Sequence, residues 1–103
     1  MLRAVVFLFG SIVTAAWAQN ALAADARQGE IVARRWCASC HVVAADQKRG
    51  TTQAAPFSTI AKKPDFDEAK IAAFLQTGHP KMPDMNLSRA EAADLAAYIK
   101  TQR

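Results

Sequence analysis

The sequence predicts a single all-α domain, and three observations support this. Three segments carry apolar residues at helical spacing, and each begins at a residue type that caps helices. No stretch of useful length alternates apolar and polar residues in the manner of a half-buried strand. With 103 residues and no internal repeat, the chain has room for at most one domain.

The N-terminal segment 1–23 is typical of a secretory signal peptide. It has a positive start, an apolar run over 4–18 and a small-residue cleavage site ending at Ala23. Cleavage there leaves a domain over 24–103, and cleavage after Ala18 fits almost as well. The alternative is an uncleaved anchor helix, although the run is shorter than the ~20 residues that span a membrane. The leader has no cysteine to carry a lipid. We therefore expect a soluble protein exported to a bacterial periplasm.

The mature domain, of roughly 80 residues, is small for an apolar core to stabilise alone. Cys37 and Cys40 lie too close together to connect distant parts of a fold, so we expect a buried cofactor to complete the core. Lys and Arg number 13 against 9 Asp and Glu. This small excess favours neither nucleic-acid nor membrane-surface binding.

The first predicted helix starts near Asp25, with Gln28 as its capping-box partner. Gly29 lies inside this helix, where glycine costs about 0.5–1 kcal/mol relative to alanine. Its presence indicates that another helix crosses closely at this point. The apolar residues at helical spacing are Ile31, Val32 and Trp36.

The middle helix is expected over 68–76, capped by Asp65 or Asp67 and stopped by Gly78. Its apolar face is Ile71, Phe74 and Leu75. The last helix begins at Ser88, which forms a Ser-x-x-Glu capping box with Glu91. Its apolar stripe is Leu95, Tyr98 and Ile99. The segments 42–57 and 79–83 are predicted to be loops, the second because of its two prolines.

The five residues from Cys37 to His41 read Cys-Ala-Ser-Cys-His and are the strongest local signal in the chain. Two thiols at this spacing can form thioether bonds to the two vinyl groups of one porphyrin. The histidine that follows is then held beneath the iron as an axial ligand. The motif therefore predicts covalent attachment of haem through Cys37 and Cys40, with His41 as an iron ligand.

A Cys-x-x-Cys pair can also serve two other functions. A thiol–disulfide redox site is expected within a βαβ pattern, and it leaves His41 unexplained. A tetrahedral zinc site needs two further Cys or His ligands, and only His79 remains.

The sixth iron position has three candidate ligands, Met82, Met85 and His79. A methionine opposite histidine raises the reduction potential and closes the iron to other ligands, whereas a second histidine lowers the potential. Met82 lies between Lys81 and Pro83, in a segment rigid enough to hold a weak ligand. Met85 could instead serve as a packing residue.

Residues 25–103 resemble the small bacterial class I cytochromes c. Gly29 stands eight residues before Cys37, and Leu95 with Tyr98 matches the Leu-x-x-Tyr pattern of the family's last helix. The resemblance implies a cytochrome c-like fold, in which three main helices and their loops surround one covalent haem. It also implies that the first and last helices cross at Gly29.

The family's ligand loop commonly reads Met-Pro, which matches Met82-Pro83 and favours Met82 over Met85 as the sixth ligand. The resemblance further implies that the carbonyl of Pro56 accepts the Nδ1–H of His41. The residues expected to line the haem pocket are Phe57, Ile60, Phe74 and Leu75.

The resemblance implies a monomeric electron carrier, not an enzyme, that cycles between ferric and ferrous iron. Its transient partners are expected to be a dehydrogenase or quinol-oxidising complex as donor and an oxidase or reductase as acceptor. In this class lysines around the haem edge steer acidic partners, and Lys81 is the best candidate among Lys48, Lys62, Lys63, Lys70 and Lys81. The alternatives are a ligand-binding or peroxidatic haem protein with an open sixth position, and a dithiol oxidoreductase.

Overall fold

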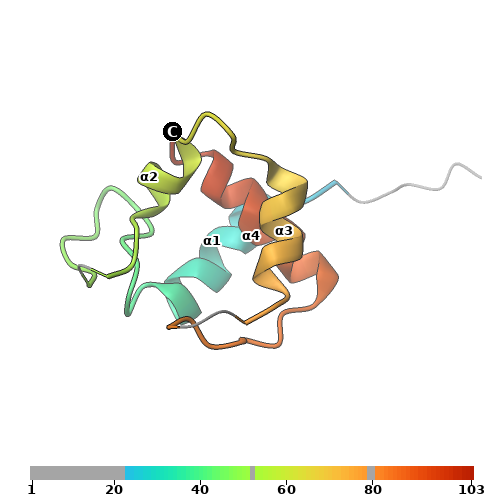
Figure 1. Ribbon diagram of the computed structural model, residues 1–103, viewed down its shortest axis with the longest axis horizontal. Coiled ribbons are helices and arrows are strands. Elements are labelled where there is room, and N and C mark those ends of the chain that lie inside the picture. The colour runs from blue at the N-terminus through green and yellow to red at the C-terminus, as the bar shows by residue number, and fades with distance from the viewer. Residues whose placement is uncertain (1–22, 52, 79–80) are drawn as a thin grey trace, which may run out of the picture.

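The computed structural model describes residues 23–51, 53–78 and 81–103 and shows a small helical domain (Figure 1). The elements are α1 (Ala26–Val32), the π-helical turn η1 (Ala33–Cys37), α2 (Phe57–Ala61), α3 (Glu68–Leu75) and α4 (Arg89–Lys100). No strand occurs in these ranges, which confirms the all-α prediction. The leader residues 1–22 and the candidate ligand His79 lie outside the described residues.

α1 begins at Asp25, as predicted, but its cap is built differently. The Asp25 carboxylate accepts the backbone N–H groups of Arg27 and Gln28 at 2.9 and 3.4 Å. A capping box would require the Asp25 backbone N–H to donate to the Gln28 side chain. This N–H donates instead to the Asp94 carboxylate at 2.7 Å. The prediction that Gln28 is the capping-box partner was wrong, because α4 places the Asp94 carboxylate beside the Asp25 amide. The start of α1 is therefore tied to α4.

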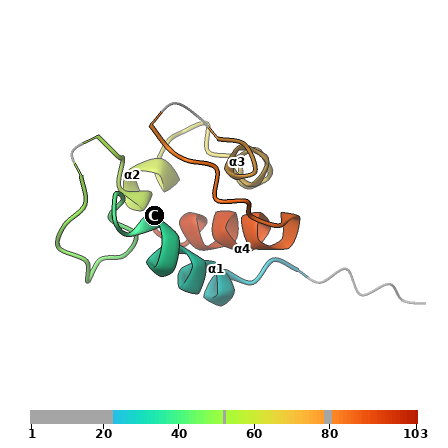
Figure 2. The same ribbon diagram turned by 90° about the horizontal axis from the view of Figure 1, so that it is seen from below.

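Gly29 is buried where α1 crosses α4 (Figure 2). A Cβ atom at this position would lie 2.6 Å from the Asp94 carbonyl carbon and 2.8 Å from the Tyr98 Cβ. It would lie closer still to the Asp94 carbonyl oxygen. The crossing predicted from the glycine is confirmed. It also explains why the helix retains a residue with a poor helical propensity.

The buried face of α1 and η1 consists of small residues. Gly29 and Ala33 are buried, whereas Ile31 and Trp36 are 53% and 51% exposed. Helix axes approach closely only where side chains are short, so the larger apolar residues point away from α4. The apolar spacing therefore identified the helix, but it did not identify its packed face.

η1 continues α1 as a wider turn that the sequence did not predict. The Ala38 N–H donates to the Ala33 carbonyl, five residues back, at 3.1 Å. Beyond it the chain turns sharply, since the N–H groups of Cys40 and His41 both donate to the Cys37 carbonyl. Turns of this π type often occur at functional sites.

α3 and α4 have the predicted caps. The Asp67 carboxylate accepts the Lys70 N–H at 2.9 Å, so Asp67 and not Asp65 caps α3. Ser88 and Glu91 form the reciprocal capping box of α4, with both hydrogen bonds at 3.0 Å. α3 ends at Leu75, one residue before its predicted end. α2 was not predicted, because one short turn capped by Pro56 carries no periodic pattern.

α4 is the centre of the fold, since α1, α2 and α3 all contact it. Its predicted stripe is buried, with Leu95 at 0%, Tyr98 at 5% and Ile99 at 2% exposure. The Tyr98 hydroxyl donates to the Val43 carbonyl at 2.7 Å. This hydrogen bond fixes the loop that contains Val43 to α4. No helix in the described ranges is long and apolar enough to span a membrane.

Candidate functional site

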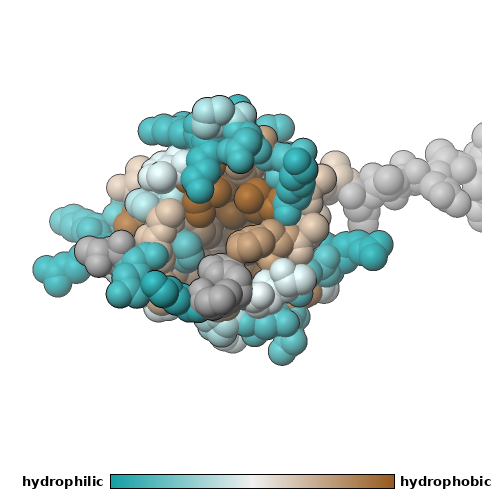
Figure 3. All heavy atoms as spheres, viewed as in Figure 1, coloured by the Kyte–Doolittle hydropathy of each residue, from teal (hydrophilic) through white to brown (hydrophobic). Residues whose placement is uncertain are grey.

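A cavity of about 520 Å³ lies between η1, α2, α3 and the loop before α4. Its volume falls in the range of ~300–1,000 Å³ that is usual for small-molecule and cofactor sites. The space-filling view shows a hollow with hydrophobic atoms inside and hydrophilic side chains around it (Figure 3). The expected pocket residues Phe57, Ile60, Phe74 and Leu75 all line it, and so do the unexpected Val32, Trp36, Ile71 and Leu87.

Cys37, Cys40 and His41 lie together on one wall of this cavity. We call Cys37–His41 the attachment segment. The turn after η1 brings both thiols and the imidazole to the same cavity, as attachment of one haem would require. Among the unexpected lining residues, Trp36 directly precedes this segment and Ile71 shares the predicted apolar face of Phe74 and Leu75, so both could have been inferred from the sequence.

The environment of Cys37 does not resemble that of a redox-active thiol. Burial, and secondarily the neighbouring Cys40, raises the pKa of the Cys37 thiol to about 11. Reactive thiols have a lowered pKa, because the thiolate is the nucleophile. Together with the absence of strands in the described ranges, this argues against a thioredoxin-like site. Those ranges also contain no cluster of three or more His, Cys, Asp or Glu that could hold a zinc ion.

The His41 ring is oriented by a backbone carbonyl. Its Nδ1 lies 2.6 Å from the Ala55 oxygen. A carbonyl oxygen can only accept, so this contact assigns the proton to Nδ1 and leaves the Nε2 lone pair free to bind a metal. The Phe57 ring packs against the imidazole, with 5.4 Å between ring centroids.

The prediction that the Pro56 carbonyl accepts the His41 Nδ1–H was wrong by one residue. The Pro56 carbonyl accepts the N–H groups of Thr59 and Ile60 at 3.0 and 3.1 Å, as the first turn of α2 requires. Because the sequence did not predict α2, the use of this carbonyl by the helix could not be foreseen. The Ala55 carbonyl lies just before the helix and reaches the imidazole instead.

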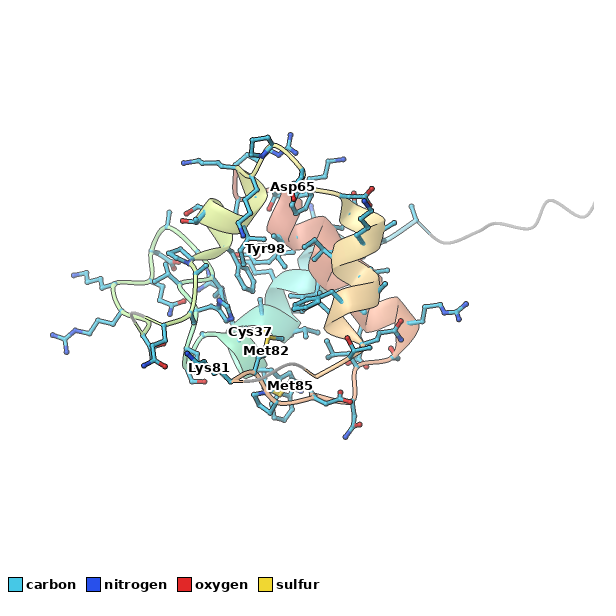
Figure 4. All side chains as sticks on the ribbon, viewed as in Figure 1. Cys37, Asp65, Lys81, Met82, Met85 and Tyr98 are labelled. Carbon is cyan, nitrogen blue, oxygen red and sulfur yellow. The ribbon has the colours of Figure 1, made fainter. Side chains whose placement is uncertain are left out.

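Met82 and Met85 both line the cavity from the loop before α4. Met82 also packs against the buried core, and its side chain points inward in Figure 4, whereas Met85 lies towards the edge of the loop. Lys81, directly before Met82, has a φ of 80°, a left-handed conformation that costs a non-glycine residue roughly 1–2 kcal/mol. This conformation sets the direction in which the chain enters Met82.

The donor set fits a covalently attached haem. Two thiols, an imidazole whose Nε2 is free and two thioether side chains line the same cavity, and most of the other lining residues are hydrophobic. Of the lysines considered as partner contacts, Lys63 and Lys81 line the cavity.

Comparison with known proteins shows the family of this chain. The family model described as cytochrome c oxidase, cbb3-type, subunit III matches residues 24–99. Cytochrome c-552 of Bradyrhizobium diazoefficiens is 49% identical over 92 residues, which cover 89% of this chain and 88% of that protein. No solved structure matches the chain. The chain therefore belongs to this cytochrome c family and is a small c-type cytochrome, an electron-transfer haem protein and not an enzyme.

Proposed function

We propose that the protein carries single electrons with one haem per chain, bound by Cys37 and Cys40 and ligated by His41 and Met82. The observation that supports this most strongly is the convergence of both thiols, an oriented imidazole and a methionine on one apolar cavity. The bound haem supplies an iron that alternates between the ferric and ferrous states. The single Cys-x-x-Cys-His motif supports one haem.

The side chains have distinct tasks in this proposal. Cys37 and Cys40 would hold the haem by thioether bonds, in which each thiol would add its sulfur to one vinyl carbon and its hydrogen to the other, so attachment would need no oxidant. His41 offers Nε2, and the Ala55 carbonyl keeps the proton on Nδ1. Met82 offers a soft sulfur that favours reduced iron and closes the sixth position. The apolar lining excludes water and holds the site in a low dielectric.

The partners are proposed to be transient redox proteins, a dehydrogenase or quinol-oxidising complex as donor and an oxidase or reductase as acceptor. Lys63 and Lys81 line the cavity and are exposed. Positive charges beside the cofactor speed the approach of an acidic partner more than they strengthen its binding. Association should therefore slow as salt rises. The chain is proposed to act as a monomer.

The protein is proposed to act in the periplasm, with segment 1–23 removed and 24–103 forming the mature domain. The leader pattern supports this, as do the start of the family match at residue 24 and the helix cap at Asp25. The intact mass of protein from a periplasmic extract tests both boundaries. A mass that retains the leader would contradict the proposal.

The visible spectrum of that protein tests the proposed ligation. A low-spin spectrum with the weak far-red ferric band of a methionine–iron bond is expected, together with haem that survives denaturation and acid–acetone extraction. A high-spin protein that binds carbon monoxide readily would support the open-site alternative. Haem lost on extraction would contradict covalent attachment.

A further inference from the structure

The side chain of Gln47 forms hydrogen bonds with the backbone of the attachment segment. The Gln47 Oε1 accepts the Val43 N–H at 2.9 Å. Its Nε2 lies 2.9 Å from the Ala38 carbonyl, 2.8 Å from the His41 carbonyl and 2.7 Å from the Arg49 carbonyl. Two amide hydrogens are thus divided among three carbonyls, two of them within the attachment segment. The amide of Gln47 is therefore fully used by the surrounding backbone.

The residues after Gln47 continue this contact. The Thr51 N–H donates to the Cys40 carbonyl at 2.8 Å. A Cβ atom on Gly50 would lie 2.7 Å from that same oxygen and 3.0 Å from the Val42 nitrogen. Only glycine permits so close an approach of two backbones. The chain from Gln47 to Thr51 therefore lies directly on the attachment segment.

The backbone carbonyls of Cys37, Cys40 and His41 all accept hydrogen bonds. The Cys37 carbonyl accepts from within the segment, as described above, and the Cys40 and His41 carbonyls accept from Thr51 and Gln47. Ordering a disordered segment costs backbone conformational entropy. Hydrogen bonds that order it in advance remove this cost from cofactor binding.

We propose that Gln47 is a positioning residue, which orders the attachment segment so that both thiols and His41 face the cavity when haem is attached. The inference rests on the proposed haem function and extends it to a residue that does not line the described cavity. Gln47 acts through the backbone, and above all through the carbonyl of His41 itself. The sequence alone offered no sign of this role, because an isolated glutamine in a loop is usually a solvated side chain.

Gln47→Glu and Gln47→Leu test the proposal in the full chain, expressed with the apparatus that attaches haem. Glutamate keeps the shape and the acceptor for Val43 but removes every Nε2 donor, while leucine removes both functions. Gln28→Glu is the matched control, since Gln28 is exposed on α1. The measurements are the fraction of protein with covalent haem and hydrogen exchange resolved along the chain.

Both Gln47 variants are expected to attach haem to a several-fold smaller fraction of the chains. Exchange of the amides of 38–43 and Thr51 should accelerate about tenfold, because the loss of these hydrogen bonds lowers the free energy of local opening. The amides of α4 should keep their protection, and Gln28→Glu should match the original protein in both measurements.

Equal attachment and unchanged local exchange in the Gln47 variants would overturn the proposal. Faster exchange throughout α4 would overturn it as well, because Gln47 would then serve only general stability. Failure of the proposed function has a different signature, namely that the unaltered chain carries no covalent haem. In that case the local difference in exchange between Gln47→Glu and Gln28→Glu still decides whether Gln47 orders the segment.

Discussion

The Nδ1 atom of His41 lies 2.6 Å from the carbonyl oxygen of Ala55, a residue 14 positions further along the chain. This contact connects the attachment segment to the entry of α2, and so to α4, which α2 contacts. The orientation of the proposed iron ligand thus depends on a helix that carries no catalytic or binding signature of its own.

Replacement of Met82 by alanine should open the sixth iron position. The ferric protein should lose its weak far-red band, bind carbon monoxide in the ferrous state and show a lower reduction potential, because a soft sulfur ligand favours reduced iron. Visible spectroscopy and a redox titration measure these changes. Met85→Ala is the matched control and should keep the spectrum, since Met85 is proposed only to pack. The reverse pattern would exchange the roles of the two methionines.

Gly29→Ala should destabilise the fold by about 1–3 kcal/mol, the usual cost of overpacking. The new methyl group would press on the Asp94 backbone and the Tyr98 Cβ, and neither can move without shifting α4. Gly78→Ala is the control, because its methyl would meet nothing closer than the Asp84 Cβ at 3.3 Å. Thermal unfolding of both variants checks the prediction, which fails if they melt at the same temperature.

Tyr98→Phe should cost about 1–2 kcal/mol, because the Val43 carbonyl loses its buried donor. The substitution should also change the response to alkali. Burial, and then the negative charge of Glu30, raises the pKa of the Tyr98 hydroxyl above its ordinary value of 10.

The sign of this pH effect follows from linkage. The unfolded chain releases the tyrosine proton at a lower pH than the folded chain, so the stability contributed by Tyr98 is present below pH 10 and is lost as the pH rises through the folded pKa. Unfolding by denaturant at several alkaline pH values measures this loss. The phenylalanine variant should show a shallower decline, and an identical decline would contradict the assignment.

Lys81→Gly and Lys81→Ala should separate the charge of this residue from its backbone conformation. Both variants should associate more slowly with an acidic redox partner at low salt, since both lose the charge. The glycine variant should be more stable than the alanine variant by about 1 kcal/mol, because glycine adopts the φ of 80° without the left-handed penalty. Equal stabilities would show that the left-handed turn is not retained.

Ser88→Ala should lower the free energy of unfolding by about 1 kcal/mol, the usual cost of losing an N-cap. The hydroxyl accepts the Glu91 N–H at 3.0 Å, and its loss also removes one half of the capping box. Ser58→Ala in α2 is a suitable control, because Ser58 caps no helix. Chemical denaturation compares the two variants.

Local sequence patterns specify the features that depend on neighbours along the chain. The spacing of Cys37, Cys40 and His41 and the caps at Ser88, Asp25 and Asp67 are local patterns. The structure confirms the caps at Ser88 and Asp25 and selects Asp67 over Asp65. It also brings the three residues of the motif to one cavity. Gly29 is a further case, since a costly glycine inside a helix implies a close neighbour even when that neighbour is unknown.

Which distant groups meet depends on how the helices and loops pack. Ala55 and not Pro56 binds the imidazole, Asp94 and not Gln28 completes the cap of α1, and Gln47 supports the attachment segment. Each of these contacts joins a side chain to a backbone group, and the distance between the two depends on how loops and helices pack. A backbone carbonyl or amide looks the same at every position of a sequence, so its partner becomes visible only when the fold brings the two together.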